Sequence, residues 1–392
     1  MSGTAFKENK GEVEPGLTGA LYVHVPFCRG KCRYCNFFSV PYNDDLAKGF
    51  TSAAMLELDR YRPSLINPLE SIFIGGGTPT ALGTEPLEQL LSALEPLADS
   101  STEFTIEANP EALEPATLKL IVEAGVNRLS MGVQSFLASE LETLGRRHSS
   151  AQAVNAVLSA RQVGIANINL DLIYGIPGQS VSTFGDSIAQ ALDLGIEHLS
   201  CYGLTFEQGT PLWHDLRAER VKAMSDELQR ECYYTAILEA ESAGRAQYEI
   251  SNFAKPSMQC RHNLTYWQNR SYLGIGPSAA SYLAGTRRTN KPDLLSYTSA
   301  LSDGTAPPST SEHLVGRAAM AETLMLGMRM IQGVDRVGFT SRFGQDPVDA
   351  FPQSMNRHKD LGTITITDHK VSLARNSLFV SDSILADILS EQ

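Results

Sequence analysis

The feature that most constrains the fold is a repeated alternation of short apolar runs with amphipathic helical stretches, beginning near residue 19. The apolar runs are typical of strands buried on both faces of a parallel sheet. They occupy residues 20–25, 71–74, 104–107, 128–131, 167–174 and 197–202. Helical patterns lie between them, at residues 43–61, 84–97, 115–124, 151–163 and 181–194. This order predicts an α/β fold in which right-handed crossovers curl the strands into an open partial (β/α)6 barrel, with its chemistry at the carboxyl ends of the strands.

The alternation also predicts the domain organisation. Residues 1–18 are polar and indicate a mobile tail, and residues 19–253 form the core. Residues 254–310 are irregular and rich in Gly, Pro and Ser, which indicates a connecting region. Residues 311–392 predict a smaller C-terminal winged-helix-like α+β domain. Its expected elements are a helix at 312–330, two strands within 361–375 joined near Asp368, and a last helix at 381–390 capped by Ser381.

Composition excludes several classes of protein. The chain has 392 residues and a formal net charge of -12, so it is a poor candidate for nucleic-acid binding, which rests on neutralising phosphates. No apolar stretch reaches the roughly 20 residues of a transmembrane segment. The first residues lack the apolar region of a secretory signal, so we expect a cytoplasmic protein. Six cysteines are too few for a disulfide scaffold.

Three cysteines, Cys28, Cys32 and Cys35, lie in a C-x3-C-x2-C pattern just after the first predicted strand. Three soft thiolates so close in sequence can hold three irons of a 4Fe–4S cluster and leave the fourth iron open to a ligand. The alternative is a zinc site completed by His24 or a distant residue. Structural zinc usually draws on two separated ligand pairs, however, and no second pair exists here. The remaining cysteines are widely spaced and are expected to be small buried hydrophobes: Cys201, Cys232 and Cys260.

This spacing, with Tyr34 just before the third cysteine, resembles the radical S-adenosylmethionine (SAM) superfamily. The surrounding YVHVPFC…YC is similar to its coproporphyrinogen dehydrogenase-like branch. The resemblance implies a 4Fe–4S cluster held by the three cysteines, whose open iron is chelated by SAM. It leaves open whether SAM is cleaved or only bound.

Polar residues at successive strand ends accompany the cysteines. A Gly75-Gly76-Gly77-Thr78 turn follows the second strand, and glycines there let a backbone approach a ligand closely, although a tight turn alone is the simpler alternative. Several polar or charged residues at the ends of other strands favour one ligand site over isolated core polar groups. The resemblance implies that SAM contacts fall at Tyr22, Gly76, Gly77, Thr78, Glu107, Gln134, Arg146 and Asp171. Arg146 has the bidentate fork that suits a carboxylate, whereas Arg147 is expected to be a solvated charge.

The segment from His262 to Trp267 fits the pattern H-N-x-x-Y-W. This motif resembles that of the heme chaperone HemW family, which implies that His262 binds heme. Neutral imidazole is a common axial ligand of heme iron, and Tyr266 and Trp267 could supply flat apolar surface. Without the resemblance, the simpler interpretation is a surface histidine with a core tryptophan at the domain junction.

The chain departs in places from the oxygen-independent coproporphyrinogen III oxidases of the same branch. Their fourth cysteine is Phe37 here, and only 27 residues precede Cys28. Ala280 stands where family members often have histidine. The sequence therefore favours a SAM-binding, iron–sulfur heme chaperone that transfers heme to acceptor proteins such as respiratory membrane enzymes. Two alternatives stay open: a coproporphyrinogen III oxidase-type radical SAM enzyme and a zinc-stabilised interaction module.

Overall fold

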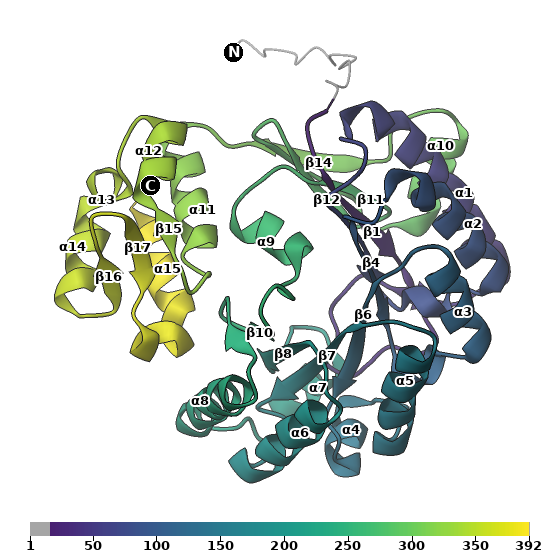
Figure 1. Cartoon of the computed structure of the whole chain (residues 1–392), viewed down its shortest axis with the longest axis horizontal. Coiled ribbons are helices and arrows are strands. Elements are labelled where there is room, and N and C mark those ends of the chain that lie inside the picture. Colours follow the sequence, from purple (N-terminus) through teal and green to yellow (C-terminus); the bar gives the residue numbers. More distant parts are fainter. Residues whose placement is uncertain (1–15, 392) are drawn as a thin grey trace.

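The computed structural model describes residues 16–391, and its largest element is a nine-stranded sheet in the order β11-β1-β4-β5-β6-β7-β8-β10-β9 (Figure 1). The central strands run parallel and follow one another in chain order, which confirms the predicted α/β core. They are β1 (Ala20–Val25), β4 (Ser71–Gly76), β5 (Glu103–Ala108), β6 (Arg128–Gln134), β7 (Asn167–Tyr174) and β8 (His198–Gly203). All their carboxyl ends therefore meet at one edge of the sheet.

Helices cover the convex face of this curved sheet (Figure 1). The covering helices are α1 (Asp44–Tyr61), α2 (Thr84–Leu94), α3 (Pro115–Glu123), α5 (Ser150–Gln162), α6 (Val181–Asp193) and α8 (Asp226–Ser242). Two shorter helices, α4 (Ala138–Leu144) and α7 (Pro211–Arg217), follow β6 and β8. Capping boxes at Ser149 and Ser180 begin α5 and α6, because each serine oxygen accepts a backbone N–H of the first turn. Within the described chain, no helix is both long and apolar enough to cross a bilayer.

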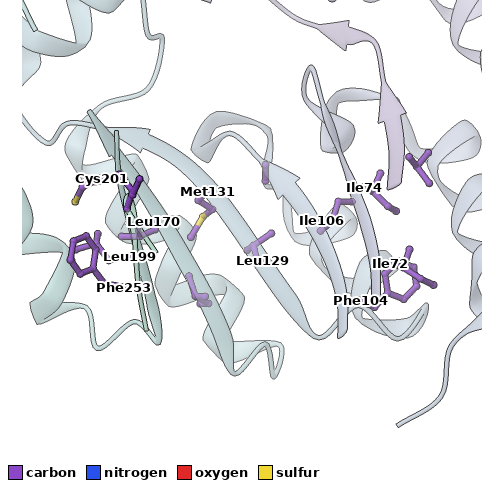
Figure 2. Packing of buried hydrophobic residues seen from close by; sticks show 14 of the residues in the cluster. Ile72, Ile74, Phe104, Ile106, Leu129, Met131, Leu170, Leu199, Cys201 and Phe253 are labelled. Carbon is purple, nitrogen blue, oxygen red and sulfur yellow. The ribbon is translucent and has the colours of Figure 1, made fainter. Parts of the chain in front are cut away.

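The main hydrophobic core lies between the sheet and these helices. Alternate strand residues such as Ile72, Phe104 and Leu129 turn toward the helices and are fully buried (Figure 2). Each large apolar side chain buried in this way contributes roughly 1.5–3 kcal/mol. The intervening residues face the concave side of the sheet, and many of them are polar: Glu103, Glu107, Arg128, Ser130, Asn169, Asp171 and Ser200.

The region predicted to be irregular, residues 254–310, contains regular elements that complete the core. Strand β10 (Asn252–Ala254) pairs with β8 and with β9 (Ala246–Gln247), and β11 (Leu273–Ile275) lies parallel to β1. Between them, α9 (Arg261–Trp267) lies between the concave side of the sheet and the C-terminal domain (Figure 1). Further along are β12 (Ala280–Leu283), β13 (Thr286–Asn290), α10 (Leu294–Ser302) and β14 (Ser309–His313). The strands β12, β13 and β14 form a separate three-stranded sheet. All these strands are too short to show a periodic pattern, and β10 and β11 pair with main-sheet strands that are distant in sequence.

The C-terminal domain differs from expectation at its start. The helix predicted at 312–330 begins only at Gly316, because Ser309–His313 pairs as a strand with β13 and Gly316 has a positive φ of 56°. The two predicted strands and the last helix are present, but Ser381 is not the cap: it is the first residue of the helix, whose N-cap is Val380 without a side-chain cap. The domain comprises α11 (Gly316–Gly327), β15 (Val334–Asp335), α12 (Arg336–Phe343), α13 (Pro347–Ala350), α14 (Pro352–Asp360), β16 (Ile364–Ile366), β17 (Lys370–Leu373) and α15 (Ser381–Ser390).

The predicted tail, residues 1–18, lies mostly outside the described residues. Its last residue, Thr18, is buried. The Thr18 hydroxyl donates to the Ser271 carbonyl at 2.7 Å, and the Thr18 carbonyl accepts from the Ile66 N–H at 2.8 Å. Thr18 is therefore anchored to the core at the entry to β1.

Candidate cluster and ligand pocket

The cysteine loop is closed at its base by two short parallel strands, β2 (Phe27–Cys28) and β3 (Val40–Pro41). The Tyr42 N–H donates to the Cys28 carbonyl at 3.2 Å, and the Cys35 N–H donates to the Cys32 carbonyl at 3.3 Å. All three thiols are free and half-buried. The loop therefore presents three neighbouring sulfur donors at the carboxyl end of β1.

A cavity of about 470 Å³ lies beneath this loop, inside the curve of the sheet. It brings together the predicted cluster ligands and all the predicted SAM residues except Tyr22. Its lining includes Cys28, Cys32, Cys35, Gly76, Gly77, Thr78, Glu107, Gln134, Arg146 and Asp171. Tyr22 and His262 do not line it.

The glycine turn after β4 needs residues without side chains. Gly76 has a φ of 109°, and a Cβ there would lie 2.7 Å from the His24 ring. A Cβ on Gly77 would lie 2.4 Å from the Phe27 carbonyl oxygen. The Thr78 N–H donates to that carbonyl at 2.7 Å, and the Thr78 hydroxyl lies 3.7 Å from the Cys28 sulfur. The turn is thus tied to the cysteine loop, and its backbone faces the cavity.

Arg146 is held in place by several partners on one side of the cavity. Its Nη1 lies 3.4 Å from the Cys32 sulfur, and its Nη2 donates to the Asn109 amide oxygen at 2.7 Å and to the Gly132 carbonyl. Its Nε is buried and has no hydrogen-bond partner. A fixed guanidinium of this kind suits recognition of a carboxylate next to the cluster loop.

Two half-buried carboxyl groups face the cavity near its strand-end rim. Glu107 accepts a hydrogen bond from the Gly76 N–H at 3.1 Å, and Asp171 accepts one from the Asn169 amide at 2.8 Å. Burial and the neighbouring charge of Asp171 raise the pKa of Glu107 from its ordinary 4.5 to about 8. Burial also raises the pKa of Asp171. A cationic ligand group would relieve this clustering of negative charge.

Replacing Glu107 by glutamine is expected to stabilise the ligand-free protein by about 2–4 kcal/mol at pH 7.5 and by less than about 1 kcal/mol at pH 5. The folded-state pKa is raised, so folding keeps the carboxyl protonated while the unfolded chain ionises above its ordinary pKa of 4.5. Stability is therefore lost as the pH rises toward about 8, and glutamine removes that loss. Chemical denaturation at both pH values checks this. The exposed Glu142→Gln is the control, and an equal effect at both pH values would contradict the expectation.

Tyr22 supports the site from below and does not line the cavity. Its hydroxyl lies 3.0 Å from His24 Nδ1, and His24 Nε2 lies 3.0 Å from the Phe38 carbonyl. His24 is buried under the Gly76 turn, as expected for a supporting histidine. Tyr22 and His24 therefore brace the turn.

His262 is buried, so its interpretation as a surface histidine is wrong. Its Nδ1 lies 2.9 Å from the Ser71 hydroxyl and its Nε2 lies 2.8 Å from the Tyr266 hydroxyl. Its ring stacks on Phe73 with 5.3 Å between centroids. Burial lowers its pKa to about 3, so the ring is neutral. Both ring nitrogens are engaged in this conformation, and neither is free to bind iron.

Two other residues of the H-N-x-x-Y-W motif, Asn263 and Trp267, lie in different parts of the structure. Asn263 lines the cavity. Trp267 lies at the junction with the C-terminal domain, with the Arg329 guanidinium 4.9 Å from its ring centroid. The motif therefore joins the cavity to the domain junction.

Sequence reasoning missed several residues that line the cavity. They include Asn109, Arg128, Ser130, Asn169, Ser200 and Asn263. The signal for three of them was present, because Arg128, Ser130 and Asn169 precede predicted site residues by even steps on the same strands and so face the same side. For Asn263 no such signal existed, since nothing local placed α9 inside the curve of the sheet.

The donor set fits an iron–sulfur cluster better than a single ion. Among residues 16–391, no three His, Cys, Asp or Glu side chains are arranged to hold one metal ion. In a cubane cluster each thiolate binds a different iron, so the three sulfurs need not converge on one point. Burial raises the pKa of the Cys28 and Cys35 thiols, so metal binding would release protons. The other cysteines, Cys201, Cys232 and Cys260, are free and buried, as expected.

Comparisons with known proteins agree with this arrangement. The radical SAM superfamily profile matches residues 22–191, and the HemN C-terminal domain profile matches residues 316–380. A heme chaperone HemW of Bacillus subtilis is 35% identical over 95% of this chain and 99% of its own length. The chain belongs to the heme chaperone HemW family. Another member, from Mycobacterium tuberculosis, is 36% identical over 84% of this chain and 86% of the relative.

Two further relatives extend the comparison. The mitochondrial radical S-adenosyl methionine domain-containing protein 1 of Danio rerio is 32% identical over 96% of this chain and 88% of its own length. The coproporphyrinogen III oxidase HemN of Escherichia coli has a TM-score of 0.83 and 20% identity, covering 97% of this chain and 92% of that one. The HemN similarity confirms the radical SAM fold with its smaller C-terminal domain.

Proposed function

We propose that the chain is a heme chaperone that carries a 4Fe–4S cluster on Cys28, Cys32 and Cys35, binds SAM beside it, and transfers heme to acceptor proteins such as respiratory membrane enzymes. The proposal that the chain binds a cluster and SAM is supported by one observation. Three free thiols, the glycine turn and the guanidinium of Arg146 all line one cavity. Membership of the HemW family supports the heme part. Thiols that serve as metal ligands need a reducing compartment, which favours the cytoplasm.

Each part of the cavity has a role in this proposal. Gly76, Gly77 and Thr78 would hold the SAM amino group through the backbone, with Glu107 balancing its charge. Arg146 would bind the SAM carboxylate. Gln134 and Asp171 would hold the ribose hydroxyls, and Tyr22 would act through His24 and the turn. When bound, a reduced cluster can supply one electron to the SAM sulfonium.

Heme ligation by His262 requires a local rearrangement. Nε2 can bind iron only when the Tyr266 hydroxyl, 2.8 Å away, has moved. His262 is already neutral, so no proton has to be removed. The cost of ligation is therefore the exchange of one hydrogen bond and the opening of a packed side of α9.

Heme titration of the purified full chain tests this proposal. His262→Ala is expected to weaken heme binding at least tenfold, because the loss of the iron ligand should cost at least about 1.4 kcal/mol of binding free energy. Tyr266→Phe is expected to tighten it about fivefold, because a hydrogen bond worth about 1 kcal/mol no longer competes for Nε2. The exposed His313→Ala is the control. Unchanged heme affinity in both His262→Ala and Tyr266→Phe would show that His262 does not bind heme. Anaerobic conversion of coproporphyrinogen III by the purified chain would favour the enzyme alternative.

A further inference from the structure

Arg128 is a buried cation whose charged neighbours, Glu103 and Asp171, form no ion pair with it within the described residues. It lies at the start of β6, is 1% exposed, and is the largest fully buried side chain of the described residues. Its Nε and Nη1 have no hydrogen-bond partner, and within residues 16–391 it forms no ion pair. The cost of burying an unpaired charge is high, so an unpaired arginine in a cavity wall indicates a missing anion.

The carboxylate of the neighbouring Glu103 accepts its hydrogen bonds from other groups than Arg128. It accepts from the backbone N–H groups of Arg261 at 3.0 Å and His262 at 3.2 Å. The Cys260 thiol donates to it at 3.4 Å. Glu103 therefore holds the first turn of α9 in place and is not within ion-pair distance of Arg128.

Two neutral groups on the cavity wall can assist Arg128. Ser130 accepts a hydrogen bond from the Asn169 amide at 2.8 Å, which leaves its own O–H to donate. The Asn263 side chain lines the cavity and makes no hydrogen bond within the described part of the chain. The contact of His262 with Ser71, and those of Glu103 with the first turn of α9, hold α9 so that Asn263 faces this space.

Arg128 lies deeper along the strands than the two acids assigned to SAM, whereas Ser130 lies level with Glu107. In the strand register, Glu107 is opposite Ser130 and Asp171 is opposite Gly132. Both acids are therefore nearer the carboxyl ends of the strands than Arg128. The cavity thus has an acidic rim beside the cluster loop and a cationic floor.

We infer that Arg128, assisted by Ser130 and Asn263, forms a carboxylate-binding site on the cavity floor, and that it takes a propionate carboxylate of the bound tetrapyrrole. The inference rests on the proposed heme function. A carboxylate matches the planar guanidinium and two further donors, and propionates are the anionic groups of heme. Asn263 directly follows His262 in sequence, so α9 would contribute both to the propionate site and to the iron ligand.

The test compares heme with heme dimethyl ester, which lacks both carboxylates, by absorbance titration of the reconstituted full chain. Wild-type protein is expected to prefer heme by about tenfold to a hundredfold, since a hydrogen bond to a charged group contributes about 1.5–3 kcal/mol. Arg128→Gln is expected to bind the two nearly equally while keeping its SAM affinity. Asn263→Ala is expected to lose part of the preference for heme. The control variant is Arg161→Gln, because Arg161 lies outside the cavity and pairs with Glu197, and it is expected to keep the full preference.

The outcomes separate the possible failures. Equal binding of heme and ester by the wild type, or a preference retained in Arg128→Gln, would overturn the inference and leave the heme function standing. Loss of SAM affinity in Arg128→Gln would assign the carboxylate to SAM and also overturn it. Absence of binding of either tetrapyrrole to the wild type would overturn both proposals. If Arg128→Gln fails to fold, Asn263→Ala is the deciding variant, because the Asn263 side chain makes no hydrogen bond within the described residues. An unchanged preference for heme in Asn263→Ala would then overturn the inference.

Discussion

Replacing Arg146 by leucine is expected to weaken SAM binding at least thirtyfold, because truncating one member of a buried charged contact costs about 2–5 kcal/mol. Arg146 is the cation fixed beside the cluster loop, with Nη2 held by the Asn109 amide oxygen and the Gly132 carbonyl. It therefore needs no reorganisation to receive the SAM carboxylate. Equilibrium binding of SAM to the anaerobically reconstituted chain measures the effect.

The adjacent arginine provides a matched control. Arg147 is partly exposed, and its side chain donates to the Arg29 carbonyl at 3.1 Å. Arg147→Leu is expected to leave SAM affinity within about twofold, as surface changes usually do. Iron content must be measured in both variants, since Arg146 also approaches the Cys32 sulfur at 3.4 Å. Unchanged SAM affinity in Arg146→Leu with the cluster intact would rule out the assigned role.

The largest expected effect on stability is that of Glu57→Ala, which should lower the free energy of unfolding by about 3–5 kcal/mol. Glu57 lies on α1 and is fully buried. Its carboxylate accepts from the Gly276 N–H at 2.9 Å and the Tyr297 hydroxyl at 2.7 Å, and it pairs with Arg288 at 3.1 Å. Removing it leaves these donors buried without partners.

This network joins elements that are far apart in the chain. It fixes α10, β13 and the turn after β11 against α1, and β11 is the edge strand next to β1. Chemical denaturation should show the loss, and the exposed Asp59→Ala on the same helix should cost less than about 1 kcal/mol. A loss of similar size in both variants would mean that the network does not stabilise the fold.

Much of the site could be predicted from the sequence because its residues follow local rules. Cys28, Cys32 and Cys35 are contiguous, so their spacing alone brings three thiols together. Glu107 and Asp171 lie toward the carboxyl ends of strands that the apolar pattern revealed, and parallel strands place their carboxyl ends at one edge. For such residues, local sequence and sheet topology together determine position.

The remaining features depend on contacts between distant segments. The strands β11 to β14 have three to five residues each and show no periodicity, so their pairing could not be predicted. The burial of His262 depends on Ser71 and Phe73 of β4, which are distant in sequence. Arg128 was included in a predicted strand, but its missing counter-ion becomes visible only when every neighbour is in place.

The central claim is that the cysteine loop carries a 4Fe–4S cluster, and iron and acid-labile sulfide analysis of anaerobically reconstituted protein tests it most directly. The account predicts about four irons and four sulfides per chain for the wild type and for Cys201→Ala. The triple variant of Cys28, Cys32 and Cys35 to alanine should retain almost none. Zinc without sulfide, or equal iron in the triple variant, would contradict the account.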